Sequence, residues 1–271
     1  MPIDQFFFYL ALVGYLLGTL HYLLHIASQR PTLGRVATYA TLAGFCAHTL
    51  SLGFRVYTLG RPPLGNFYES LSFFAWAIVL TYLVTELRYG NRVIGAFVLP
   101  MVLLASSIAA ALPHRIAELG PRLQGMGLWV HVALAILGNA AFALTFCAGL
   151  MYILQERQLK SRHLGRMLFR LPSLELLDDV SVKSLLFGFP LLTLALITGS
   201  MWAGVTRGSF LPLYGREIWS ILSWLIYGGL LYARLSAGWR GRKAAILAII
   251  GFCLVLFTLV GVSLVRTGRP L

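Results

Sequence analysis

Apolar and polar positions follow one another in long blocks along this chain. Eight blocks stay mostly apolar over about 20 residues, the length a helix needs to cross the hydrocarbon core of a bilayer. Polar segments, several of them rich in glycine and proline, separate the blocks. The predicted spans are residues 5–27, 36–57, 70–87, 93–112, 128–154, 185–205, 217–235 and 244–265. The pattern predicts an all-α fold, a polytopic membrane bundle of about eight transmembrane helices.

The composition supports the same class. Of 271 residues, 58% are hydrophobic and 11% charged, and the mean hydropathy is +0.79. A water-soluble globule of this size could not bury so much apolar surface. Because little chain lies outside the apolar blocks, we predict a single membrane domain over residues 1–271. The first block has no Lys or Arg before it and no small-residue cleavage site after it, so we expect a retained helix and not a signal peptide.

The distribution of basic residues predicts the orientation, because Lys and Arg collect in cytoplasmic loops. Of the 22 Lys and Arg residues, 14 fall on one side and 8 on the other. The richer side includes the segment 155–184, which is therefore expected to be cytoplasmic. Both termini and His131 are then expected at the outer face of a multi-pass protein in a bacterial inner membrane.

The net charge of +13 would suggest nucleic-acid binding in a soluble protein. In a membrane protein it is explained by the orientation signal and by contact with anionic lipids. We therefore expect anionic lipids, and no nucleic acid, among the partners.

Two histidines within the apolar blocks are candidates for chemistry, because a polar side chain in lipid needs a partner or a ligand. His131 begins the outer part of its block, and Ala135, Gly138 and Phe142 share its helical face. That mostly small face could receive a neighbouring helix closely or leave room for a flat ligand such as a porphyrin. His48 lies near the middle of another block, where hydrogen bonding between helices and ligand binding both remain open.

One family resemblance bears on these alternatives. The segment "WVHVALAILGNAAFALTFCAGLMYILQ", residues 129–155, resembles the helix that carries a heme-ligand histidine in cytochrome c assembly proteins of the CcsA type. Further similar segments, in the same order as in that family, include "GRPPLGNFYESL", "TGSMWAGVTRGSF" and "GWRGRKAA". The resemblance implies a protein that holds heme at the outer face and presents it to the CxxCH thiols of apocytochrome c.

The sequence also departs from the family pattern. Between Gly208 and Trp219 the chain lacks most of the tryptophan-rich motif of the assembly proteins, including its aspartate. Tyr232 stands where those proteins often have a transmembrane histidine, and no histidine follows near the C-terminus. This reduced pattern is similar to the HemX-like branch, whose members are associated with heme biosynthesis.

The expected cofactor is a non-covalent, b-type heme. Low-spin heme iron takes two axial ligands, and propionates pair with arginine. His131 is the first predicted metal ligand; His48 is the second, with His114 as the choice from a loop. Arg55 and Arg61 are predicted to bind the propionates.

Two residues near the predicted outer end of the seventh span complete the candidate site. Glu217 would anchor one of the arginines, and Trp219 would stack on a ring. Anchoring at the membrane interface is the alternative for both side chains.

Other functions stay open at this level. The chain has no Ser-His-Asp, HExxH, P-loop or GxGxxG spacing, so we expect a heme-handling protein and not an enzyme, except that a CcsA-type protein would assist covalent heme attachment. A transporter, or a scaffold that regulates heme biosynthesis through residues 155–184, is the alternative. The predicted partners are heme and either apocytochrome c or a membrane assembly protein.

Overall fold

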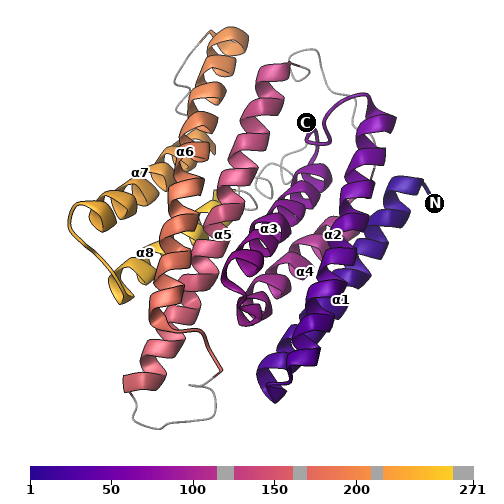
Figure 1. Ribbon diagram of the computed structural model, residues 1–271. Helices are drawn as coiled ribbons and strands as arrows, with labels where there is room; N and C mark the ends of the chain where they lie inside the picture. The colour runs from indigo at the N-terminus through magenta and orange to yellow at the C-terminus, as the bar shows by residue number, and fades with distance from the viewer. Residues whose placement is uncertain (115–124, 161–169, 209–215, 259–271) are drawn as a thin grey trace. The chain divides into compact units, whose positions relative to one another are not determined.

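A computed structural model describes residues 1–114, 125–160, 170–208 and 216–258, apart from the side chains of Arg207, Arg216 and Glu217. The described residues form helices joined by short connections and include no strand (Figure 1). The elements are α1 (Ile3–Ser28), α2 (Pro31–Leu59), α3 (Phe67–Tyr89), η1 (Arg92–Ile94), α4 (Gly95–Ala111), α5 (Met126–Lys160), α6 (Leu174–Arg207), α7 (Arg216–Leu235) and α8 (Arg242–Leu256). All eight apolar blocks therefore contain a helix, and the all-α prediction is confirmed.

Six of these helices are long and apolar enough to cross a membrane, within the residues that the structure describes. The six are α1, α3, the η1–α4 segment, α5, α6 and α7. Helix α2 is not among them; the stretch between its two arginines contains His48 and several Thr and Ser residues, which lower its hydropathy. The described part of α8 has 15 residues, and its predicted span continues past residue 258, outside the described part. The protein is thus a multi-pass helical membrane protein.

Two helices extend beyond their apolar blocks. Helix α5 continues to Lys160, and α6 already begins at Leu174. The extensions carry ion pairs spaced by four residues, Lys160–Glu156 at 2.6 Å and Lys183–Asp179 at 2.7 Å. Such pairs stabilise an exposed helix modestly. Hydropathy detects the part of a helix that lies in lipid, so it missed these polar turns.

The fold contains two compact units. The first unit comprises Met1–Glu118 with Leu154–Leu176, and the second comprises Leu119–Ile153 with Leu177–Leu271. This division does not test whether residues 1–271 form a single membrane domain, which stays a prediction. His48, Arg55 and Arg61 belong to the first unit, and His131 belongs to the second.

Close packing of α1 on α2 builds the first unit (Figure 1). A Cβ atom added to Gly14 would lie 2.6 Å from the Cα atom of Gly44, so the two backbones touch where neither residue has a side chain. Small residues of this kind let membrane helices approach closely and gain van der Waals contact.

A buried carboxylate joins the same helices further along the bundle. Glu86 of α3 accepts hydrogen bonds from Tyr22 of α1 at 2.7 Å and from Tyr82 at 2.6 Å. Thr38 of α2 also donates to it, and Arg92 of η1 lies 3.3 Å away. Because every contact comes from a donor, this cluster satisfies a carboxylate that burial would otherwise penalise.

In the second unit, aromatic stacking and an ion pair connect the helices. Phe142 of α5 and Tyr227 of α7 stack with ring centroids 3.6 Å apart. Arg234, at the end of α7, lies 2.9 Å from the Asp178 carboxylate of α6. The ion pair ties the α7–α8 turn to α6.

The predicted orientation has a direct test. Single cysteines at Ser173 and Gly125 would be introduced after Cys46, Cys147 and Cys253 are replaced by alanine. We expect a membrane-impermeant maleimide to label Gly125→Cys in intact cells and Ser173→Cys only after the membrane is opened, because the side richer in Lys and Arg is predicted to be cytoplasmic. Labelling of Ser173→Cys in intact cells would reverse the orientation.

Candidate functional site

His131 lies in the second turn of α5, and its ring is held by α6. Its Nδ1 atom is 2.6 Å from the backbone carbonyl oxygen of Ala195, which is 64 positions away in the chain. The imidazole lies against Gly199, one turn further along α6: a Cβ atom there would be 2.6 Å from Nδ1 and 2.7 Å from Cε1. The side chain is partly buried.

This hydrogen bond determines the tautomer of a neutral His131. A carbonyl oxygen only accepts, so Nδ1 must carry the proton and donate it. The lone pair of the neutral ring then resides on Nε2, the atom through which an imidazole can bind a metal. A donor bond from the other ring nitrogen to a carbonyl is the usual second contact of a metal-binding histidine.

The small face below His131 is occupied by a helix. A Cβ atom on Gly138 would lie 3.0 Å from the carbonyl oxygen of Gly188, and one on Gly188 would lie 2.8 Å from the Phe142 ring. Helices α5 and α6 therefore pack backbone against backbone along this face. Of the two interpretations left open by the sequence, close helix packing is the one the structure shows for Gly138.

The predicted residues of α7 lie in the second unit with His131. The ring of Trp219 packs edge to face on Phe257, with centroids 4.8 Å apart. This contact gives Trp219 a role in joining α7 to the end of α8. The Glu217 side chain and residues 209–215 of the altered tryptophan motif lie outside the described part of the chain.

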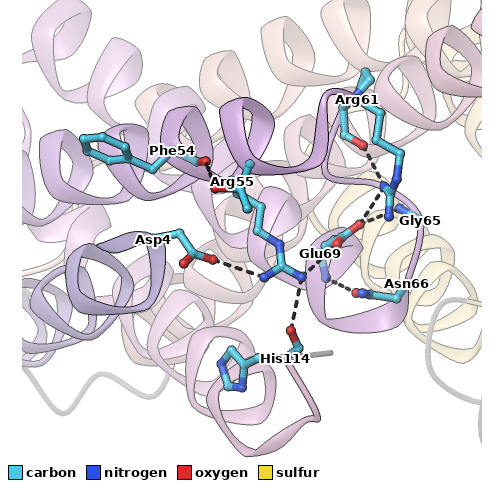
Figure 2. A network of polar contacts seen from close by, with 10 residues as sticks. Asp4, Phe54, Arg55, Arg61, Gly65, Asn66, Glu69 and His114 are labelled. Carbon is cyan, nitrogen blue, oxygen red and sulfur yellow. Dashed lines mark hydrogen bonds and ion pairs between the residues drawn. The ribbon is translucent and has the colours of Figure 1, made fainter. Parts of the chain in front are cut away.

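Arg55 and Arg61 both bind carboxylates of the protein in the first unit (Figure 2). Arg55 of α2 lies 3.1 Å from Asp4 of α1 and 3.0 Å from Glu69 of α3, and it also donates to the carbonyl of His114. Arg61 lies 3.1 Å from the other oxygen of Glu69. Two cations and two carboxylates thus form a nearly buried network with no net charge.

Glu69 is the centre of this network. It accepts the amide of Gly65 at 2.8 Å in addition to both arginines, and its own amide donates to the Asn66 side chain that caps α3 (Figure 2). Asn is a favoured helix cap because its oxygen satisfies an amide of the first turn. The "GRPPLGNFYESL" segment is therefore shaped by a cap and a carboxylate three residues apart, a pattern readable in the sequence.

His114 borders the network. Its ring lies 4.3 Å, centroid to centroid, from that of Tyr68. Burial, together with the Arg55 cation, lowers the pKa of His114 below its ordinary value of 6.5. These surroundings favour the neutral imidazole, and its Nε2 atom is buried without a hydrogen-bond partner in the described structure.

His48 connects three helices within the first unit. The Tyr15 hydroxyl of α1 lies 3.0 Å from Nδ1, and the Ser72 hydroxyl of α3 lies 2.8 Å from Nε2. The side chain is fully buried, and the Phe8 ring packs edge on against it. Both ring nitrogens are engaged, so iron ligation would require His48 to lose one of these bonds.

Replacing His48 distinguishes a role in hydrogen bonding between helices from a role as an iron ligand. His48→Ala should lower the free energy of unfolding by about 1–3 kcal/mol, because it leaves the Tyr15 and Ser72 hydroxyls without their shared partner. Unfolding in detergent measures this, with Cys46→Ala, an exposed site on the same helix, as the control. A His48→Ala protein of unchanged stability whose heme spectrum is altered would make His48 a ligand.

Comparison with known proteins identifies the family. The model of the family described as "Cytochrome C assembly protein" matches residues 64–269. The chain belongs to this family. "Cytochrome c biogenesis protein CcsA" of Pyropia yezoensis is 30% identical over 87% of this chain and 86% of its own. The protein of that name from Synechococcus sp. (strain CC9902) is 33% identical over 81% of each chain.

The described residues of this cytochrome c assembly protein contain no group of three or more His, Cys, Asp or Glu arranged to hold a metal ion. A heme needs no such cluster, because the porphyrin supplies four nitrogens and the protein only axial ligands. The Nε2 atom of His131, which carries the lone pair of the neutral ring, can serve as one such ligand.

Two residues of this family member escaped the sequence prediction, Ala195 and Gly199. Neither has a polar side chain, and both act through the backbone or through the lack of a Cβ atom. The spacing of small residues by four along α6 was the available signal.

Proposed function

We propose that this chain acts in cytochrome c assembly by holding heme, its cargo, through His131. The cytochrome c role follows from the family and from relatives named cytochrome c biogenesis proteins. The observation that carries the heme assignment is the hydrogen bond from Nδ1 of His131 to the Ala195 carbonyl. It presents Nε2 as the ligand atom and limits rotation of the ring.

The surroundings of His131 suit an iron ligand. A carbonyl that accepts from Nδ1 increases the electron density of the imidazole and strengthens its bond to a metal. Helix α6 packs against the helix face below His131, which lies near the start of α5. The distribution of basic residues leads us to propose that this end of α5 lies near the outer membrane surface. A heme bound there would supply iron for the Nε2 atom of His131 to bind, and we propose that this heme is held without covalent attachment to the protein.

The proposal includes the acceptor and the location. Heme held near the outer face of a bacterial inner membrane would be offered to the thiols of apocytochrome c, with a membrane assembly protein and anionic lipids as further partners. Arg55 and Arg61 would bind heme propionates only by exchanging a protein carboxylate for a propionate, since Asp4 and Glu69 already neutralise them.

Absorbance of the purified protein tests the proposal. The full chain, extracted in mild detergent from cells with ample heme, should show a heme spectrum that changes on reduction, and a pyridine hemochrome assay should report b-type heme. A protein that stays colourless, and that takes up no hemin when titrated, would contradict heme binding and favour a scaffold or transporter.

A further inference from the structure

Gly199 of α6 lies where the imidazole of His131 meets the backbone. A Cβ atom there would be 2.6 Å from Nδ1, 2.7 Å from Cε1 and 3.3 Å from Cγ. The first two distances are far below van der Waals contact, and the obstructing atoms belong to a ring that is itself hydrogen bonded. An alanine at this position and the observed ring position therefore exclude each other.

Backbone conformation does not explain this glycine. Gly199 is not among the glycines with positive φ, and it lies inside the continuous helix α6. A glycine in a helix interior is less stable there than an alanine. The absence of a Cβ atom at this position leaves space for the His131 ring, and this contact offsets the lower helix stability.

The acceptor of the imidazole lies one helical turn before Gly199. The Ala195 carbonyl accepts from Nδ1 of His131 at 2.6 Å and from the Thr198 hydroxyl at 3.1 Å. The Thr198 hydroxyl also donates to the Leu194 carbonyl at 2.8 Å, so the carbonyls of Leu194 and Ala195 share this one donor. Ala195 and Gly199, four apart, face His131 together.

We propose that Gly199 is a positioning residue for the heme ligand His131: the missing Cβ atom lets the imidazole reach the Ala195 carbonyl, which fixes its tautomer and the direction of Nε2. This inference rests on the proposed function. A side chain at position 199 moves the ring away from the carbonyl, so the ligand loses both its orientation and the electron density that the hydrogen bond supplies.

Gly199→Ala should weaken hemin binding about 10- to 100-fold, the effect usual for losing the second contact of a metal-binding histidine. Its remaining heme should have a raised midpoint potential, because a less electron-rich imidazole stabilises ferric iron less. Gly229→Ala is the matched control: Gly229 lies in α7 of the same unit, and nothing lies within 4 Å of its added Cβ atom. It should keep the affinity and potential of the wild type.

A second variant covers the case in which Gly199→Ala does not fold. Thr198→Val removes the hydroxyl that competes for the Ala195 carbonyl but leaves position 199 open. The carbonyl then accepts more strongly from His131, so the midpoint potential should fall, opposite to the change in Gly199→Ala. An unchanged or raised potential in a folded Thr198→Val protein overturns the inference.

A double-mutant cycle separates positioning from general packing. In a His131→Ala background, Gly199→Ala should have no further effect on hemin affinity; an undiminished effect there, or wild-type affinity and potential in Gly199→Ala alone, overturns the inference. Absence of heme from the wild-type protein overturns the proposed function and this inference together. A His131→Ala protein that has lost heme, beside a Gly199→Ala protein with the hemin affinity and midpoint potential of the wild type, overturns the inference alone.

Discussion

His131→Ala is expected to lose heme or to change its axial spectrum. The variant removes the nitrogen that we propose binds iron, and helix α6 packs against the small face below it, so that face does not offer a replacement ligand. His131→Met should retain a low-spin spectrum, since a thioether also serves as an axial ligand. Heme content per protein and the reduced-minus-oxidised spectrum measure both outcomes at comparable expression.

A second histidine offers a close control for this experiment. His21 of α1 also places its Nδ1 atom near a backbone carbonyl, 2.7 Å from that of Leu17, but within its own helix. His21→Ala should leave the heme spectrum unchanged. Full heme content with an unaltered spectrum in His131→Ala would end the assignment of His131 as a ligand.

Glu69→Gln should produce the largest loss of stability among the substitutions proposed. It removes the carboxylate shared by Arg55 and Arg61, so that Arg55 keeps its ion pair with Asp4 and Arg61 loses its ion pair with Glu69. Breaking a buried ion pair by removing one partner costs about 3–5 kcal/mol, because the remaining charge stays desolvated. The free energy of unfolding of the heme-free protein in mixed micelles measures the loss.

An exposed ion pair provides the comparison. Asp179→Asn breaks the ion pair with Lys183. The Asp179 side chain is 41% exposed and the Lys183 side chain is 47% exposed. Solvent screens such a pair, so the expected cost is at most about 1 kcal/mol. Equal stability of Glu69→Gln and the wild type would show that the network contributes little to folding.

The sequence alone determined the class of fold and the best ligand candidate. Burying apolar side chains in lipid is a property of each segment by itself, so hydropathy located the eight α-helices that the structure describes. His131 stood out for a similar local reason, an imidazole within an apolar block. The ends of the helices were predicted less well, because polar turns such as Glu156–Lys160 are helical and are stabilised by contacts that hydropathy does not measure.

The tertiary structure decided which groups meet. The contacts of Arg55 with Asp4 and of His131 with Ala195 join residues 51 and 64 positions apart on different helices. Periodicity shows which face a residue occupies but not which helix covers that face. The sequence therefore proposed a propionate for Arg55 and either a helix or a ligand for the face below His131. In the folded protein, carboxylates lie beside Arg55 and helix α6 packs against the face below His131. A buried charge needs a partner of opposite charge, and a face of small residues needs a helix that approaches closely; only the fold decides which groups meet these needs.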